Sequence, residues 1–344
     1  MKAIRPVLII AAFFALCVGT ALAKDTLRIL AFSGYADHDW VVQFEKQFNA
    51  TIDVTVIDTD DALWDKLSKN SGQDFDVFAT NTAELQRYID KGIASPINLE
   101  HIPNVRNQLP RFQAMTKSPG IMRLDKSYAI PYTYSEMGLI YDKKQFDKPP
   151  KTMAEMWDPK YKGKILLYDG TTHNFSFTAL VLGIQNPFQL SDENFRKVVS
   201  KLVELRDNEP RYYTSPEDGA KEFRENKVAL MFGNFGTQQV KKLQDVGASI
   251  GYVLPVEGSL AWLDCWAISS ATKNRALAEQ WINFTLSAPI AAALSERQSL
   301  ANTLTKSSIK PTDKILWLEP VEDAEKRTRL WDRIRKDNAR SKQF

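Results

Sequence analysis

The chain has 344 residues, of which 44% are hydrophobic and 25% charged, and its formal net charge is +3. This length is sufficient for two domains, each with an ordinary hydrophobic core. Because basic and acidic residues nearly balance, bulk charge does not indicate a nucleic-acid partner, and we expect none.

The first 23 residues predict a cleavable secretory signal. Lys2 belongs to a short basic start, residues 7–18 are an apolar run too short to span a bilayer comfortably, and "ALA" at 21–23 supplies small residues before the cleavage point. A membrane anchor is the alternative for this segment. After cleavage Cys265 is the sole cysteine, so no internal disulfide is possible. We expect a protein exported to a bacterial periplasm.

Strand-like and helix-like patterns then alternate along the chain. Strands are expected at 26–32, 52–58 and 75–80, and helices between and after them at 39–50, 60–70 and 82–92. This order predicts an α/β fold with a largely parallel sheet and helices on both faces. In such sheets ligands bind beyond the carboxyl ends of the strands.

The second half of the chain repeats the scheme. Residues 209–215 predict a loop, and Ser215 followed by Pro216 predicts a capped helix start. Strands are expected at 137–142, 163–169, 228–234 and 250–255, and helices at 152–157, 174–184, 191–207, 215–223, 274–286, 289–298 and 320–339.

The stretch "GSLAWLDCWAI" (258–268) has the apolar character of a buried strand, but Asp264 interrupts it. A carboxylate is costly to bury unless another group pairs with it. On a strand Trp262, Asp264 and Trp266 share one face, while Cys265 points to the other and is expected to be a buried free thiol.

Several stretches together resemble periplasmic solute-binding proteins of the spermidine/putrescine type, the receptors of ABC importers. They are "YDKKQF", "MWDPKYKGK", "PVEGSLAWLD" and the "N-x-x-x-A-x-x-x-I-N-F" pattern of the following helix. The resemblance extends along essentially the whole chain after the signal segment. It implies a type II periplasmic binding fold with two lobes, two hinge crossings and a ligand cleft between the lobes.

The resemblance also implies domain boundaries. Lobe one would comprise 24–133 plus 265–305, and lobe two 137–262. The tail, 306–344, would be helical and pack near lobe two. The hinge crossings would be Tyr134–Glu136 and Trp262–Asp264, which would place Asp264 on a hinge strand facing the cleft.

Family members hold amines with aromatic walls and carboxylates, because ammonium groups are attracted to ring faces and donate to ionised acceptors. Matching the motifs places Phe32 and Tyr35 (in "AFSGY"), Asn81 (in "FATNT"), Trp262 and Asp264 in the cleft. Asp264 would be the ammonium partner.

Two matches depart from the family pattern. Gly170 and His173 stand where polyamine binders have acidic residues for the far amine, and Asn234 stands where the family often has tryptophan. A second ammonium without a partner would be costly to bury, so we expect a ligand with one cationic end. A one-residue slip in this alignment would instead bring Asp169 into the site and favour a diamine.

Arg211 is the candidate partner for an anionic end of the ligand. It lies in the expected loop "EPRYYTS", and a guanidinium suits a carboxylate. A 4-aminobutyrate-like ω-amino acid would then bridge Asp264 and Arg211. The alternative is that Arg211 is a solvated loop residue.

The leading hypothesis is a monomeric receptor that carries a small amine-bearing solute to the permease subunits of an ABC importer, without catalysis, cofactor or metal. Tyr212 and Tyr213, with His38 as a further candidate ligand, make a ferric-ion receptor the first alternative. The three histidines lack zinc-site spacing. A secreted hydrolase is the second alternative, but it would need a nucleophile, a base and an orienting group that these scattered histidines do not provide.

Overall fold

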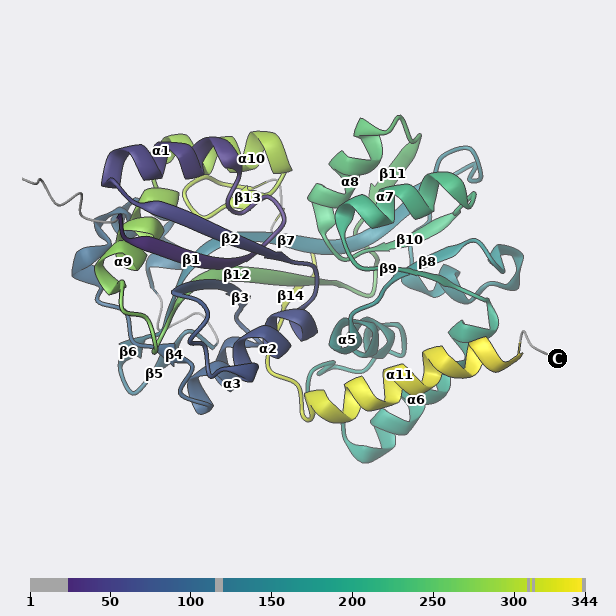
Figure 1. Cartoon of the computed structure of the whole chain (residues 1–344). Coiled ribbons are helices and arrows are strands. Elements are labelled where there is room, and N and C mark those ends of the chain that lie inside the picture. The colour runs from purple at the N-terminus through teal and green to yellow at the C-terminus, as the bar shows by residue number, and fades with distance from the viewer. Residues whose placement is uncertain (1–23, 115–119, 308–309, 311–312, 342–344) are drawn as a thin grey trace, which may run out of the picture.

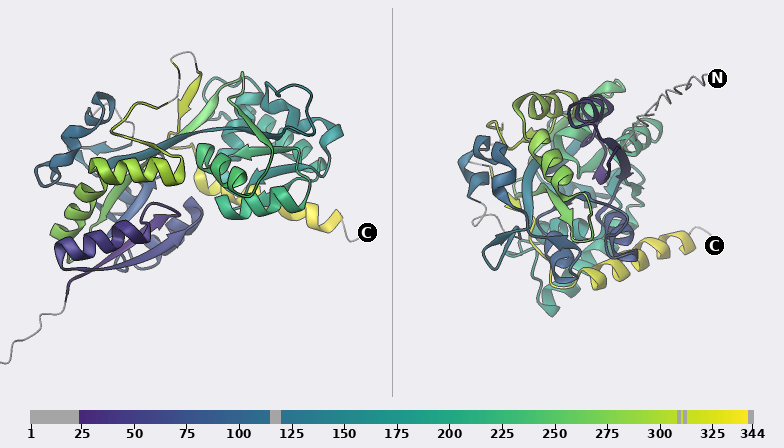
Figure 2. Two further views of the ribbon diagram at one scale, coloured as in Figure 1. Left: turned by 90° about the horizontal axis from the view of Figure 1, so that it is seen from above. Right: turned by 60° about the vertical axis from the view of Figure 1, so that its left-hand side comes forward.

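The computed structural model describes residues 24–114, 120–307, 310 and 313–341, so the expected signal segment lies outside the described residues. The described elements form two groups that lie side by side and are joined by long strands (Figure 1; Figure 2, left). We call the group containing the first strands lobe one and the other group lobe two. No helix of the described ranges has the length and apolar character needed to cross a membrane.

Two long strands connect the lobes: β7 (Ala129–Asp142) and β12 (Ser259–Ser269). From Ala129 to Met137, β7 pairs antiparallel with β12. From Gly138 onward it pairs instead with strands of lobe two, β10 (Leu230–Gly233) and β11 (Ile250–Val253). The chain therefore passes from one lobe to the other within β7 and returns within β12.

Lobe one is built on the predicted parallel strands. β1 (Thr26–Phe32) pairs with β2 (Thr51–Ile57) and β3 (Val77–Asn81), and β12 closes this side antiparallel to β3. The helices that cover this half are α1 (His38–Phe48), α2 (Asp60–Lys69), α3 (Leu85–Asp90), α4 (Pro110–Gln113), α9 (Arg275–Thr285) and α10 (Ala288–Gln298). Short pieces complete it: β4 (Ala94–Ser95), η1 (Leu99–His101), η2 (Pro103–Asn107), β5 (Met122–Arg123), β6 (Lys126–Ser127) and β13 (Ala301–Asn302).

Lobe two continues the sheet from β10 through β8 (Ile165–Tyr168) to β9 (Arg211–Tyr213), all three parallel. Its helical segments are η4 (Met153–Trp157), η5 (Pro159–Tyr161), α5 (Thr171–Val181), α6 (Asp192–Asp207), α7 (Pro216–Glu225) and α8 (Gly236–Asp245). Within the described residues all strands of both lobes, apart from the β5–β6 hairpin, belong to one 12-stranded sheet.

Most predicted elements of lobe two are present, with three differences. The expected loop at 209–215 contains strand β9, the expected helix at 152–157 is a 3₁₀ helix, and α8 was not predicted. The predicted start of α7 is confirmed, because Ser215 Oγ accepts a hydrogen bond of 3.2 Å from the backbone N–H of Asp218.

The C-terminal segment first follows the hinge and then lies on lobe two. β14 (Ile315–Trp317) pairs with the start of β12, and α11 (Ala324–Ser341) packs against α5 and α6, where Figure 1 shows it in yellow. Arg327 of α11 is fully buried and pairs with Glu322 at 2.7 Å while donating to Ser176 Oγ at 2.9 Å. These partners offset the cost of burying a guanidinium, so α11 is held firmly on α5, the helix that carries His173.

Candidate functional site

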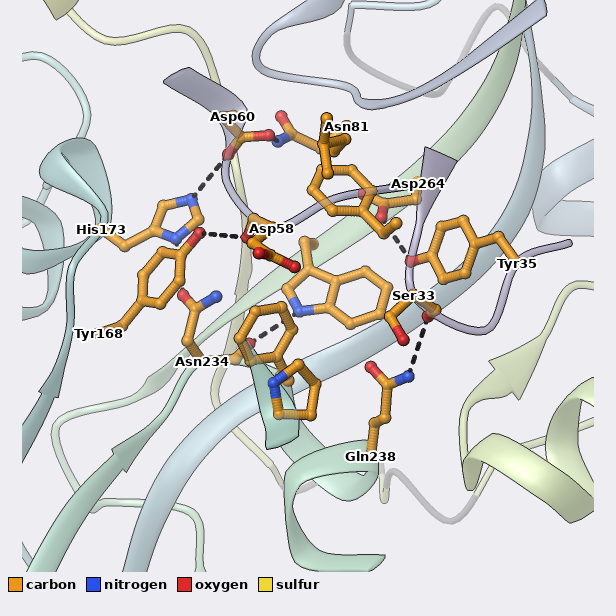
Figure 3. A pocket seen from close by; sticks show the side chains of 15 residues that line it. Ser33, Tyr35, Asp58, Asp60, Asn81, Tyr168, His173, Asn234, Gln238 and Asp264 are labelled. Atoms are coloured by element: carbon orange, nitrogen blue, oxygen red, sulfur yellow. Dashed lines mark hydrogen bonds and ion pairs between the residues drawn. The ribbon is translucent and has the colours of Figure 1, made fainter. Parts of the chain in front are cut away.

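A pocket lies between the lobes, over the point where β12 crosses (Figure 3). It contains about 500 Å³ of empty space, open solvent at its mouth included. Residues named by the sequence analysis that line it are Phe32, Tyr35, Asn81, His173, Asn234, Trp262 and Asp264. Residues that the sequence analysis did not select also line it: Ser33, Ile57, Asp58, Asp60, Tyr168, Pro216, Phe235 and Gln238.

Asp264 is buried in the wall of this pocket, with 6% of its surface exposed. Tyr35 Oη donates a hydrogen bond of 2.5 Å to Asp264 Oδ2. Burial raises the pKa of Asp264 to about 8, with the nearby Asp60 carboxylate adding to the rise and the Tyr35 bond opposing it. Among the residues that the structure describes, the carboxyl group therefore has one neutral donor, Tyr35, and no counter-ion, a state that a bound cation would relieve.

The strand around Asp264 is irregular. Asp264 pairs with Thr133 of β7, but the next residue, Cys265, pairs with Pro131, so Tyr132 is an extra residue on β7. Such a bulge bends a strand and re-aims nearby side chains, and bulges are frequent beside functional sites. Here it falls where the strands leave lobe one, immediately next to the buried carboxyl group.

Aromatic side chains form much of the remaining wall. Trp262 is 6% exposed, and its Nε1 donates a hydrogen bond of 2.9 Å to the backbone oxygen of Asn234 in lobe two. Phe32 packs edge-on against Tyr35, with ring centroids 5.9 Å apart. Aromatic rings beside a buried carboxylate are suited to an organic cation.

Two acidic residues of the pocket, Asp58 and Asp60, were not predicted from the sequence. Asp60 is the first residue of α2, and its Oδ1 accepts a hydrogen bond of 3.0 Å from Asn81 Nδ2. Burial raises the pKa of Asp60 to about 6, against the opposing charge of Arg87. A signal was available, since both acids directly follow strand β2, at the carboxyl end where ligands bind in such sheets.

Lobe two faces these acids with neutral polar groups (Figure 3). His173 Nδ1 lies 2.7 Å from Asn234 Oδ1, and burial lowers the pKa of the imidazole. Tyr168 Oη donates to the backbone oxygen of Asp58 at 3.3 Å. Gln238 Nε2 donates to the backbone oxygen of Ser33 at 3.2 Å. The last two bonds join the lobes on two sides of the pocket.

Arg211 does not line the pocket, which corrects the expectation that it meets an anionic end of the ligand. Arg211 is the first residue of β9 and is exposed, and its Nη1 lies 3.7 Å from Glu222 Oε2. β9 runs parallel to β8, and Tyr213 at its far end is paired with Tyr168, which reaches the pocket. Arg211 therefore lies at the opposite end of the strand from the ligand side.

Asp169 is also absent from the pocket lining. It accepts a hydrogen bond of 3.1 Å from Trp331 Nε1 and pairs with Arg335, both on α11. The alternative alignment that would have brought Asp169 to the ligand is therefore not supported, and the acids that line the pocket besides Asp264 are Asp58 and Asp60.

The tyrosine pair behind the ferric-ion alternative is engaged elsewhere. Tyr213 Oη donates to the backbone oxygen of Phe232 at 2.6 Å and accepts from the N–H of Asn234 at 3.0 Å. The ring of Tyr212 packs edge-on against Trp331. Across the part of the chain that the structure describes, no group of three or more His, Cys, Asp or Glu side chains is placed to hold a metal ion.

Comparison with known proteins agrees with this architecture. A relative named putrescine-binding periplasmic protein PotF, from Escherichia coli, is 24% identical over 312 residues, covering 86% of this chain and 82% of the relative. Spermidine/putrescine-binding periplasmic protein 1 of Haemophilus influenzae is 22% identical over 324 residues, covering 89% and 87%. These two proteins and this chain match over nearly their full lengths.

Solved structures show the same fold. The structure titled putative spermidine/putrescine ABC transporter from Listeria monocytogenes superposes with a TM-score of 0.79 at 20% identity, covering 91% of this chain and 99% of that one. The predicted type II two-lobed fold is thus confirmed. The family model for bacterial extracellular solute-binding proteins matches residues 39–316. The chain belongs to the bacterial extracellular solute-binding protein family.

Proposed function

We propose that this protein is a periplasmic receptor that binds a small di- or polyamine and presents it to the permease of an ABC importer. The observation that carries the proposal is the composition of the pocket wall. Asp58, Asp60 and Asp264 line it together with aromatic rings, and no Lys or Arg is among the described residues that line it. Relatives with periplasmic polyamine-binding names support the same assignment.

This composition favours a ligand with two cationic ends over a zwitterion. A carboxylate of an ω-amino acid would enter a wall that holds three acidic residues and no cation, and like charges placed together in a desolvated site cost several kcal/mol. The expectation of a ligand with one ammonium was based on the loss of acids from lobe two. Asp60 supplies a second carboxylate from lobe one instead.

Transport requires no chemistry at this site. Ligand bound to lobe one and the hinge strand would draw lobe two over it, through contacts such as Tyr168 to Asp58 and Gln238 to Ser33. The closed pair of lobes would then present the surface that the permease recognises. Family members are binding proteins of transporters, so the hydrolase alternative is not favoured.

The test is direct binding. Protein purified without added ligand is denatured, and released small molecules are identified by mass spectrometry. The stripped and refolded protein is then titrated calorimetrically with 1,4-diaminobutane, spermidine and 4-aminobutyrate. We expect an amine among the released molecules and binding of at least one of the two polyamines. Binding of 4-aminobutyrate alone would overturn the proposal.

Trp262→Phe should weaken 1,4-diaminobutane binding about 3- to 10-fold, since a desolvated cation–π contact contributes about 2 kcal/mol and phenylalanine retains only part of it. The change in tryptophan fluorescence on ligand addition should be largely lost in this variant. Trp157→Phe is the control, because Trp157 lies in lobe two outside the pocket. Equal effects of the two substitutions would exclude Trp262 as the aromatic wall.

A further inference from the structure

Asp60 and His173 face one another across the pocket, and the atoms that face each other, Asp60 Oδ2 and His173 Nε2, are both hydrogen-bond acceptors. With the amide oxygen of Asn234 accepting at 2.7 Å, Nδ1 of His173 carries the hydrogen, and Nε2 of the neutral ring is left with a lone pair. That Nε2 is 3.9 Å from Asp60 Oδ2, beyond hydrogen-bond distance. His173 is buried, so its Nε2 is aimed at the carboxylate from a desolvated ring.

The other neighbours of Asp60 leave Oδ2 available. Its Oδ1 is engaged by Asn81 Nδ2 at 3.0 Å. Arg87 reaches only the backbone oxygen of Asp60, at 3.4 Å, and forms its ion pair with Glu84 at 2.6 Å. Two acceptors, Asp60 Oδ2 and His173 Nε2, thus approach one another, and no described side chain donates a hydrogen bond to either of them.

We propose that one ammonium of the ligand binds between Asp60 Oδ2 and His173 Nε2 while the other binds Asp264, so that the preferred ligand is a short α,ω-diamine. An ammonium has three N–H donors and no acceptor, and so satisfies a carboxylate and an imidazole lone pair at once. The acceptors are spaced closely enough for one nitrogen to donate to both. This inference rests on the proposed function and names the ligand class of that site.

Asn81 fixes the separation of the two ammonium positions. Its Cα is paired with that of Asp264 in the β3–β12 register, and its amide holds Asp60. Asp264 therefore stands on the hinge strand and Asp60 at the start of α2, and Asn81 at the edge of the lobe-one sheet connects the two. Lobe two adds the neutral His173, which distinguishes this site from one in which each lobe supplies an acid.

Ionisation is consistent with these roles. Burial lowers the pKa of His173, so the ring is neutral at pH 7, and the pKa of Asp60, at about 6, leaves that carboxylate ionised there. A protonated imidazole would compete with the ligand for Asp60. A neutral imidazole adds an acceptor instead.

The test compares 1,4-diaminobutane with 1-aminobutane by calorimetric titration of the unaltered protein, Asp60→Asn and Asp65→Asn. Asp65 is the matched control, since it is an exposed acid of the same helix, α2, and lines neither the pocket nor the adjoining cavity that Asp60 and His173 share. We expect Asp60→Asn to weaken the diamine at least tenfold and the monoamine less than threefold. Asp65→Asn should change neither more than threefold. Thermal unfolding of each variant checks that it is folded.

A second readout follows the imidazole itself. The nitrogen resonances of His173, assigned with a His173→Phe variant, should show an Nε2 without hydrogen that shifts on addition of 1,4-diaminobutane and not of 1-aminobutane. Equal losses for both amines in Asp60→Asn, or an unmoved Nε2, would overturn the inference and leave the receptor assignment standing. If the unaltered protein bound spermidine but not 1,4-diaminobutane, the inference alone would fail. If it bound neither of these two, the proposed function would fail together with it.

Discussion

Asp264→Asn is expected to weaken binding of 1,4-diaminobutane by about 10- to 100-fold, because a hydrogen bond to a charged partner contributes about 1.5–3 kcal/mol. The substitution also places an amide where a carboxylate stood. If the amide oxygen keeps the bond from Tyr35, its N–H₂ group turns toward the ammonium and repels it. Calorimetric titration at pH 8 measures the loss.

The matched control is Glu136→Gln. Glu136 is a buried acid on the other hinge strand, β7, and burial raises its pKa as well, but it does not line the pocket. We expect its affinity for the diamine to remain within threefold of the unaltered protein. If the two substitutions weakened binding equally, the effect would belong to the hinge, and Asp264 would lose its assignment as the ammonium acceptor.

Much of the site could be predicted from the strand "SLAWLDCWAIS". Its single acid, between two tryptophans, disagrees with the apolar pattern of a buried strand. Such disagreements between a residue and its surroundings are expected at functional sites. The structure places Trp262 and Asp264 together in the pocket wall. The bulge beside Asp264 could not be predicted, because the extra residue lies on β7, far away in the sequence.

Asp60 was missed for a different reason. Acidic residues in the first turn of a helix are explained by the helix dipole alone, and "TDDALW" has that pattern. Only the neighbouring strands show that this helix start opens into the cleft. Thr59 provides the cap of α2, since its Oγ1 accepts from the N–H of Ala62 at 3.1 Å. Asp60 is therefore not needed for capping, and its side chain lines the pocket.

Arg211 illustrates the opposite error. A guanidinium next to two tyrosines suggested an anion site. The segment is a strand, however, and the direction in which it runs determines which of its two ends lies near the ligand. Within three residues the chain goes from exposed Arg211 to fully buried Tyr213. Which end of β9 faces the cleft depends on its parallel pairing with β8, and residue type does not carry that information.

Binding of the diamine should strengthen about tenfold for each pH unit between pH 6 and pH 8, and then level off. Ligand-free Asp264 has a pKa of about 8, so below that pH the carboxyl group holds a proton that it must lose to accept an ammonium. The ammonium groups remain charged throughout this range, because alkyl ammonium pKa values lie near 10. Burial lowers the pKa of His173 from its ordinary value, so protonation of the imidazole does not compete with the ligand at pH 7 and above.

Calorimetry in two buffers of different ionisation enthalpy should therefore show close to one proton released per diamine bound at pH 7, with Asp60 adding to the release only toward pH 6. Asp264→Asn should release almost none. A flat affinity from pH 6 to pH 8, with no proton release, would contradict the assignment of Asp264 as a carboxyl group held neutral until ligand arrives.

Stability of the ligand-free protein should respond to pH in the opposite direction. The pKa of Asp264 is raised in the folded state from an ordinary value of 3.8, so between about pH 4 and pH 8 the folded chain holds a proton that the unfolded chain has lost. The free energy of unfolding then falls as pH rises through this window. Asp264→Asn removes this contribution, so its melting temperature should exceed that of the unaltered protein at pH 8 by more than at pH 5. Without ligand, the buried Asp264 carboxylate lowers the stability of the folded protein. With ligand bound, the same carboxylate forms an ion pair with the ammonium. The burial that destabilises the ligand-free site is therefore also a source of ligand affinity.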